Sequence, residues 1–281
     1  MKNMSRTILA ALLTLGALGP FPASACTGFC AKGKDLVLVG NNEDWANPRS
    51  RIWFVPAEKG AHGRMFVGFD NGFPQGGMND QGLFFDGFAT PRLEMAPTPD
   101  REIYFGNPAT KALAECATVD EVVRLFDKYT RPDSAVLFFA DRNGDAVAIE
   151  PQAAVRKKHW FFVQTNFYQS RTPPGTETCQ RFKIATRMLE DSRGAISVDL
   201  FRRILAATHQ EGNATTQYSN IYDLTARVMY LYHFHNFENV VRIDLAAELQ
   251  KGAHTLEIPS LFPRTYAAEA HARWYEKERK K

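Results

Sequence analysis

The sequence contains little that would make it a disulfide-rich, nucleic-acid-binding or membrane-spanning protein. Its formal net charge of +3 is too small to imply nucleic acid or an anionic membrane as a partner. After the N-terminal region, no stretch approaches the roughly eighteen uninterrupted apolar residues of a transmembrane helix, so we expect no transmembrane segment. The cysteines are too few for a disulfide scaffold, although one bridge such as Cys116–Cys179 is open; they are Cys26, Cys30, Cys116 and Cys179.

Several common catalytic signatures are also missing. There is no G-x-S-x-G elbow, no recognisable Ser-His-Asp arrangement and no glycine-rich phosphate loop. Cys26 and Cys30 do not have the C-x-x-C spacing of a disulfide oxidoreductase. His233 and His235 would share one face of a strand, a spacing that can bind zinc, but no third ligand is suggested nearby. We therefore expect no metal ion and no cofactor.

What the sequence does contain is an export signal. Lys2 and Arg6 precede an apolar run over residues 8–18, and Ala23-Ser24-Ala25 follows as an A-x-A cleavage site. We expect residues 1–25 to be removed as a signal peptide, which takes away two basic residues and leaves a net charge of +1. The mature chain, 26–281, is predicted to be a single domain in the periplasm or outside the cell.

Cleavage at this position would make Cys26 the first residue of the mature protein. An N-terminal cysteine carries a thiol and a free α-amine, and the α-amine, with a pKa of about 7.7–8.0, can accept the thiol proton. A lipoprotein cysteine is the alternative, because a small residue precedes Cys26. Two points argue against a lipoprotein. Ala23 stands where lipoprotein signals usually have leucine. An acylated α-amine, moreover, could not act as a base for the thiol.

A β-hairpin is predicted directly after Cys26. Residues 27–39 contain two β-rich apolar runs separated by the turn residues Gly33-Lys34. A two-residue loop would place Cys26 opposite Asn41, and a three-residue loop would place it opposite Asn42. In either case the polar segment that begins at Asn41 is brought beside the N-terminus.

The rest of the chain consists of alternating blocks of strands and helices, an order that favours an α+β layered domain over a regularly alternating parallel sheet. The phenylalanines between residues 66 and 88 are interpreted mainly as core, with Phe88 as a candidate for the lining of an acyl-chain groove. Residues 76–82 are predicted to form a turn, and the C-terminal residues a solvated helix or a frayed end. Strands are predicted over 52–55, 65–69, 83–88, 135–140, 146–150, 160–164, 217–223, 228–234 and 240–243, and helices over 108–116, 119–128, 179–189 and 198–207.

Short motifs follow the predicted cleavage site in a fixed order. They are Cys26-Thr27-Gly28, Gly40-Asn41-Asn42-Glu43-Asp44, Gly77-Met78-Asn79-Asp80-Gln81-Gly82-Leu83, Thr165-Asn166, Arg181-Phe182 and Thr216-Gln217-Tyr218. Together they resemble the choloylglycine hydrolase and penicillin V acylase family, a branch of the N-terminal-nucleophile hydrolases that cleaves linear amide C–N bonds. The resemblance implies a four-layer αββα sandwich of two largely antiparallel sheets.

The resemblance also implies roles for four residues. Cys26 matches the nucleophile, whose own amine relays the proton, and Asp44 matches the aspartate that holds this amine and thiol in place. Asn166 matches the asparagine whose amide helps to bind the tetrahedral oxyanion. Arg181 matches an arginine close to the nucleophile, where a cation favours the thiolate.

Two positions depart from the family pattern. Asn41 stands where the family often has arginine, and it could be a substrate contact or only a hairpin partner. Ala89 stands where another active-site polar residue is common. Bile-salt cleavage therefore does not follow from the resemblance.

The sequence as a whole predicts an exported hydrolase that cleaves a linear amide of a small N-acylated molecule through a thioester. Candidate substrates are N-acyl amino acids, acyl-homoserine lactones, phenoxyacyl penicillins and conjugated bile acids. A homo-oligomer is compatible with the sequence. Acyl transfer to a second amine, and a non-catalytic surface lipoprotein or binding module of the same fold, are the alternatives.

Overall fold

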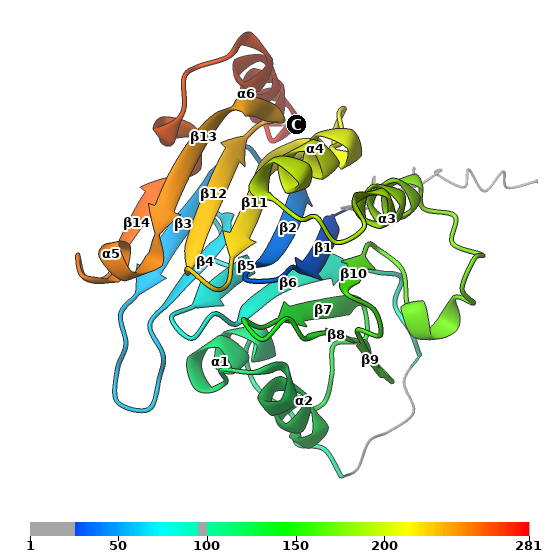
Figure 1. Ribbon diagram of the computed structural model, residues 1–281. Helices are drawn as coiled ribbons and strands as arrows, with labels where there is room; N and C mark the ends of the chain where they lie inside the picture. Colours follow the sequence, from blue (N-terminus) through cyan, green and yellow to red (C-terminus); the bar gives the residue numbers. More distant parts are fainter. Residues whose placement is uncertain (1–25, 95–99, 281) are drawn as a thin grey trace, which may run out of the picture.

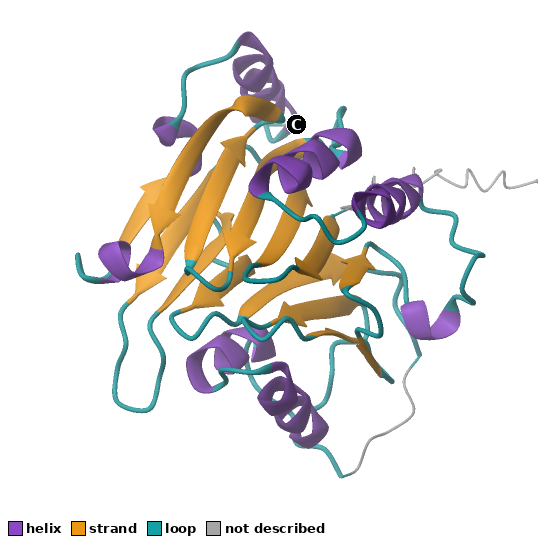
Figure 2. Cartoon of the chain, viewed as in Figure 1, coloured by secondary structure: helices purple, strands orange, loops and turns teal. Residues whose placement is uncertain are grey.

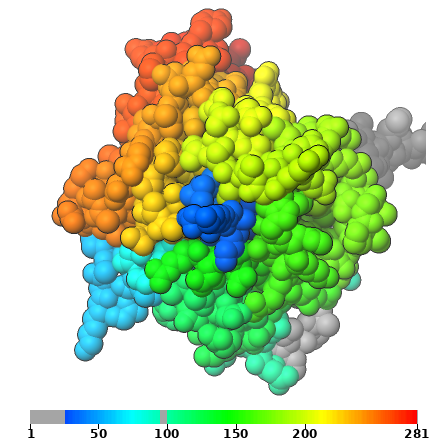
Figure 3. All heavy atoms as spheres, viewed as in Figure 1, coloured from blue at the N-terminus to red at the C-terminus, as the bar shows by residue number. Residues whose placement is uncertain are grey.

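The computed structural model describes residues 26–94 and 100–280, so the predicted signal peptide lies outside the described residues. Two antiparallel sheets are stacked face to face, and helices cover the outer side of each sheet (Figures 1 and 2). The predicted four-layer αββα sandwich is confirmed. Only a small patch of the N-terminal segment, coloured blue, reaches the face shown in Figure 3, where later segments of the chain surround it.

The first sheet has six strands, and its centre contains the predicted N-terminal hairpin. The order across the sheet is β10-β1-β2-β11-β12-β13, so the hairpin lies between two strands from the second half of the chain. The strands are β1 (Thr27–Lys32), β2 (Val37–Asp44), β10 (Phe161–Gln164), β11 (Thr216–Asp223), β12 (Val228–His233) and β13 (Asn236–Asp244).

The second sheet has eight strands in the order β14-β3-β4-β5-β6-β7-β8-β9. Apart from β14, each strand pairs with the next one along the chain. The strands are β3 (Ser50–Val55), β4 (Arg64–Phe69), β5 (Pro74–Asn79), β6 (Phe84–Ala89), β7 (Ala135–Ala140), β8 (Ala146–Ile149), β9 (Ala154–Arg156) and β14 (His254–Glu257).

Two pairs of helices cover the sheets, and α6 forms the predicted C-terminal helix. The pair α1 and α2 packs on the eight-stranded sheet, and the pair α3 and α4 packs on the six-stranded sheet. No helix in the described part of the chain is long and apolar enough to cross a membrane. The α-helices are α1 (Pro108–Glu115), α2 (Val119–Lys128), α3 (Gln180–Ser192), α4 (Val198–Thr208), α5 (Leu245–Leu249) and α6 (Tyr266–Glu278), with short 3₁₀ turns at Gln169–Arg171 and Ile258–Leu261.

The alternation of side chains along each strand divides the apolar residues into three layers. Phe29 on β1 faces α3 and α4, where its ring packs against that of Phe201. Phe85 on β6 faces α1 and α2, whereas Phe88 on the same strand faces the other sheet. The layer between the sheets is closed tightly at Gly28, where an added Cβ would lie 2.6 Å from the Phe88 ring.

The register of the N-terminal hairpin differs from both predicted registers. Lys32 pairs with Val37 and Thr27 with Asn42, so the next residue back, Cys26, lies beside Glu43. The reason is a four-residue loop over 33–36, closed by a hydrogen bond from the Gly33 amide to the Leu36 carbonyl. The second strand therefore begins at Val37, and Leu36, the first residue of the second apolar run, belongs to the loop.

The predicted pairing of His233 and His235 on one strand face is also wrong. Strand β12 ends at His233, and β13 begins at Asn236. Phe234 and His235 between them form the turn, with φ values of 48° and 47°. His235 therefore lies outside the strand.

Further differences concern short strands. Residues 76–82 were predicted as a turn, but β5 extends to Asn79 because the two glycines before Met78 allow close pairing with β4 and β6. The strands β9 and β14 lie at the edges of the eight-stranded sheet and were not predicted.

The motif around Asn79 has a structural function. The Asn79 side-chain amide donates to the carbonyls of Leu113 (2.9 Å) and Cys116 (2.8 Å) at the end of α1. Its oxygen accepts from the amides of Gln81 (3.1 Å) and Leu83 (2.9 Å) across the turn. A single buried side chain therefore fixes both the β5–β6 turn and the helix packed on it.

Replacing Asn79 should destabilise the fold. In Asn79→Ala, four buried polar groups lose their partner, and we expect the free energy of unfolding to fall by about 2–4 kcal/mol. Urea unfolding measures this change. Gln81→Ala in the same turn is the control and should cost less than about 1 kcal/mol; equal losses for the two variants would contradict the role of Asn79.

Candidate active site

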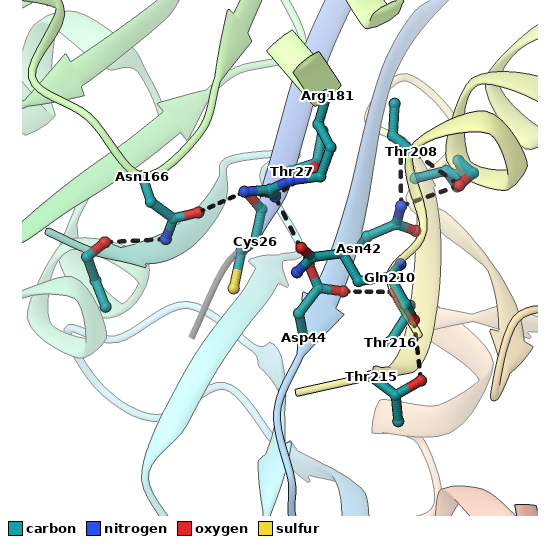
Figure 4. Close-up of polar contacts among 12 residues, drawn as sticks. Cys26, Thr27, Asn42, Asp44, Asn166, Arg181, Thr208, Gln210, Thr215 and Thr216 are labelled. Atoms are coloured by element: carbon teal, nitrogen blue, oxygen red, sulfur yellow. Dashed lines mark hydrogen bonds and ion pairs between the residues drawn. The ribbon is translucent and has the colours of Figure 1, made fainter. Parts of the chain in front are cut away.

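Cys26 lies at the end of a central strand and is surrounded by side chains from both halves of the chain. It directly precedes β1, which pairs with β2 on one side and with β10 on the other. Its side chain is only 2% exposed. Figure 4 shows Arg181 on one side of Cys26, Asp44 on a second and Asn166 on a third.

Arg181 is the residue that joins these groups. It is the second residue of α3, and its Nη1 donates to the Cys26 carbonyl oxygen (2.6 Å) and to Thr27 Oγ1 (2.8 Å). The same Nη1 lies 3.6 Å from Asp44 Oδ2, and Nη2 donates to Asn166 Oδ1 at 3.3 Å. One guanidinium thus contacts the backbone of Cys26 and both polar side chains predicted to act with it.

Asp44 ends β2 on the side that faces the helices, and it is fully buried. Thr216 Oγ1 donates to Asp44 Oδ1, and Gln210 Nε2 donates to Asp44 Oδ2 at 2.8 Å. Burial raises the pKa of Asp44 to about 7, although these hydrogen bonds and Arg181 act in the opposite direction. Gln210 is brought into place because Asn42 Nδ2 donates to the Leu205 carbonyl (3.0 Å) and so fixes the last turn of α4 on β2.

Asn166 follows β10 and has a fixed orientation. Its oxygen accepts from Arg181, and its Nδ2 donates to the Ala89 carbonyl at 2.9 Å. The amide donor is therefore directed to the last residue of β6. The structure brings together all four residues that the sequence predicted as catalytic: Cys26, Asp44, Asn166 and Arg181.

The two predicted substrate-binding residues lie in the layer between the sheets. Asn41 shares the inner face of β2 with Glu43, and it is fully buried. Phe88 is also fully buried and packs against Phe138, with 6.4 Å between ring centroids. In this structure Phe88 is therefore a core residue.

Two acidic residues close to the nucleophile were not identified from the sequence. Glu43 lies beside Cys26 in the hairpin, and Asp86 extends from β6 of the facing sheet, between Phe84 and Phe88. Both are about 1% exposed. A lone carboxylate in the apolar run Phe84-Phe85-Asp86-Gly87-Phe88 was a readable signal, because buried charges are rare without a specific function.

The carboxyl groups act strongly on the thiol. Burial raises the pKa of Cys26 well above its usual value, and the negative charges of Glu43, Asp44 and Asp86 raise it further. Arg181 contacts the Cys26 carbonyl instead of the thiol, and its charge acts on Asp44. In this arrangement Arg181 positions the backbone of Cys26 and acts on Asp44, and its effect on the thiolate stays a prediction.

One group of potential metal ligands is present in the described residues. Ligand atoms of His209, Glu211 and His235 lie within 4.8 Å of one another. However, the two imidazoles stack with 5.1 Å between their centroids and an interplanar angle of 26°. Stacked rings direct their nitrogen lone pairs along nearly parallel lines and not toward one point, so we assign no metal to this group.

Comparisons of the sequence find no matching family model and no matching curated protein. Comparisons of the structure do find relatives. Penicillin V acylase from Agrobacterium tumefaciens superposes with a TM-score of 0.64 at 16% identity, over 83% of this chain and 92% of that one. A variant of conjugated bile acid hydrolase from Clostridium perfringens gives 0.66 at 19% identity, over 83% and 97%.

An N-acylethanolamine-hydrolyzing acid amidase ortholog from Caenorhabditis elegans gives a TM-score of 0.55 at 17% identity, over 82% of this chain and all of that one. The chain has the N-terminal-nucleophile hydrolase fold. At these identities the likeness concerns the fold, and the chemistry must be argued from the side chains.

The buried carboxyls predict a particular dependence of stability on pH. The pKa values of Glu43 and Asp44 are raised to about 8 and about 7, so the folded state retains protons that the unfolded chain has already released. The free energy of unfolding should therefore fall by about 1–2 kcal/mol between about pH 6.5 and about pH 8. His233, with its pKa lowered by burial to about 4, stays neutral in this range.

Urea unfolding at several pH values tests this expectation. Glu43→Gln should reduce the pH slope, and Glu58→Gln, at an exposed position, should retain it. A stability that is constant or rises over the same range would contradict the assigned protonation of the two carboxyls.

Proposed function

We propose that the protein is an exported cysteine N-terminal-nucleophile hydrolase that cleaves a linear amide bond of a small N-acylated molecule. The observation that carries this proposal is the contact of one guanidinium with the Cys26 carbonyl, Asp44 and Asn166 at the start of β1. The proposal includes removal of residues 1–25, because the chemistry requires a free α-amine on Cys26.

The reaction has two halves. The neutral α-amine of Cys26 takes the thiol proton, and the thiolate attacks the amide carbonyl carbon. The C–N bond then breaks as the α-ammonium gives its proton to the leaving nitrogen, which releases the amine and leaves a thioester. In the second half the α-amine accepts a proton from water and the hydroxide attacks the thioester. The C–S bond then breaks, the α-ammonium returns its proton to the Cys26 thiolate, and the acid is released.

The negative oxygen of each tetrahedral intermediate requires donors already in place. Asn166 Nδ2 is such a donor, because Arg181 holds the amide oxygen and so fixes the direction of the NH₂ group. In the resting state this NH₂ group donates to the Ala89 carbonyl. Asp44 would bind the α-ammonium and favour the charged intermediate, since it is buried and lies beside the chain end.

The proposal of an amide substrate is supported by the structural relatives, which are named an acylase, a conjugated bile acid hydrolase and an acid amidase. The fold alone does not fix the acyl group or the amine. A screen should therefore include N-acyl amino acids, acyl-homoserine lactones, phenoxyacyl penicillins and conjugated bile acids.

The nucleophile can be tested against a matched thiol on the same strand face. Cys26→Ala should abolish turnover, whereas Cys30→Ala, which removes a buried thiol four residues away, should retain it. The measurements are amine release and the intact mass of the wild-type protein. A mass that starts at unmodified Cys26 is expected; a lipid-sized addition, or turnover by Cys26→Ala, would overturn the proposal.

The oxyanion donor gives a second test. Asn166→Ala should lower kcat by about 10²–10³-fold, because a fixed donor to the transition state is lost. The stability of the fold should change little, since Asn166 is partly exposed. Asn213→Ala, in an exposed loop, is the control; a change confined to KM in Asn166→Ala would assign this residue to ground-state binding instead.

A further inference from the structure

A group of buried polar side chains lies between the sheets next to Cys26, on the face opposite Arg181. Glu43 comes from the six-stranded sheet, and Asp86 comes from the facing strand β6. The Cys26 thiol lies close enough to Glu43 to lower the pKa of that carboxyl by hydrogen bonding, and Asp86 raises the pKa of the thiol. The two carboxyls are therefore immediate neighbours of the proposed nucleophile.

These carboxyls have no cation beside them in the described part of the chain. The groups that act on Glu43 are Asp44, the thiol and Asn41, and those that act on Asp86 are Glu43 and the Gly87 amide. Burying two ionised carboxylates without a counter-charge costs folding free energy, and proteins normally pair such groups with cations. The α-amine of mature Cys26 supplies at most one positive charge, which it would share with Asp44 and which it loses before it takes the thiol proton.

Several hydrogen-bonding atoms in the same layer are also open. Tyr218 on β11 is paired directly with Glu43, and Asn220 is paired with Asn41, so their side chains share the inner face. Native proteins leave few buried polar atoms without a partner, so a cluster of them indicates a ligand. Around Glu43 and Asp86, the atoms that lack a partner among the described residues include Asn41 Oδ1, Glu43 Oε2, Asp86 Oδ1, the Tyr218 hydroxyl and Asn220 Oδ1.

We propose that Glu43 and Asp86 bind an ammonium or guanidinium group of the substrate, a few bonds from the scissile amide. This inference rests on the proposed function, because it places the cation beside the amide that Cys26 would attack. With both carboxyls ionised, most of the open atoms are acceptors, which matches a ligand with several N–H donors and does not match an anion.

The bound cation would also affect the nucleophile. Burial raises the pKa of both carboxyls, so they ionise together only against a counter-charge, and in their ionised forms they oppose formation of the thiolate. A positive charge between the two carboxyls would offset that repulsion when substrate is present. A cationic substrate would therefore occupy the site without leaving uncompensated negative charge beside Cys26, whereas a neutral substrate of the same shape would leave the carboxyls without a counter-charge.

The test uses pairs of substrates that differ only in charge. Guanidinium and urea groups are nearly isosteric, so 4-guanidinobutanoyl amides are compared with 4-ureidobutanoyl amides for a cation on the acyl side. Phenylacetyl amides of agmatine are compared with those of its urea analogue for a cation on the amine side. We expect the wild-type enzyme to prefer the guanidinium member of one pair by at least about tenfold in kcat/KM.

The carboxyl variants assign the preference to this cluster. Glu43→Gln and Asp86→Asn keep the side-chain shape and should each reduce the preference to below about threefold. Asp70→Asn, which changes a carboxyl paired with Arg49 near the surface, should leave the preference unchanged. A preference that persists in both cluster variants would overturn the proposal, as would equal kcat/KM values for both pairs in the wild-type enzyme.

Failure of the cation site and failure of the proposed function give different results. Turnover of neutral amides that depends on Cys26, without a preference for guanidinium, would reject the cation site and leave the hydrolase in place. If no amide is cleaved, the proposed hydrolase function is rejected. The cation site is then tested by calorimetric titration of the Cys26→Ala variant with the two ligands below. Binding of N-butylguanidinium but not of N-butylurea would support the site, and equal or absent binding of both would reject it.

Discussion

The ion pair between Arg181 and Asp44 is the interaction on which the rest of the site depends. Asp44 is fully buried, and an isolated carboxylate there would be strongly unfavourable. Arg181 can reach Asp44 because α3 begins beside Cys26, at the start of β1, and Arg181 lies in the first turn of this helix. The same side chain fixes the Cys26 carbonyl and Asn166, so one buried charge pair organises the chain end and the proposed oxyanion donor together.

The two faces of the central strands have different functions around this pair. On the helix side, Asn42, Gln210 and Thr216 form a network of satisfied hydrogen bonds with Asp44 and α4. On the inner side, Asn41, Glu43 and their neighbours on β11 have unsatisfied atoms. The period-two alternation of β2 thus separates positioning residues from residues available to a ligand.

Much of this arrangement could be read from the sequence, and the limits are physical. The strand and helix blocks were recognisable because their apolar periodicity is strong, and the four predicted catalytic residues were placed by short motifs. The hairpin register was missed because nothing local showed that Leu36 belongs to the loop. Asp86 stands out in the sequence as a lone carboxylate in an apolar run, but its proximity to Glu43 could not be predicted, because contacts between sheets leave no periodic signal. The turn at Phe234 and His235 was missed because neither residue is typical of positive φ.

The straight path of β1 has a consequence for the redox behaviour of the protein. Cys26 and Cys30 lie four residues apart along extended backbone, so their Cα atoms are separated by about 13 Å. A disulfide requires a separation below about 7 Å. The strand therefore keeps the proposed nucleophile apart from the thiol of Cys30, and pairing within the six-stranded sheet holds the strand extended. Even in an oxidising environment, Cys26 and Cys30 cannot form a disulfide with each other while β1 stays paired.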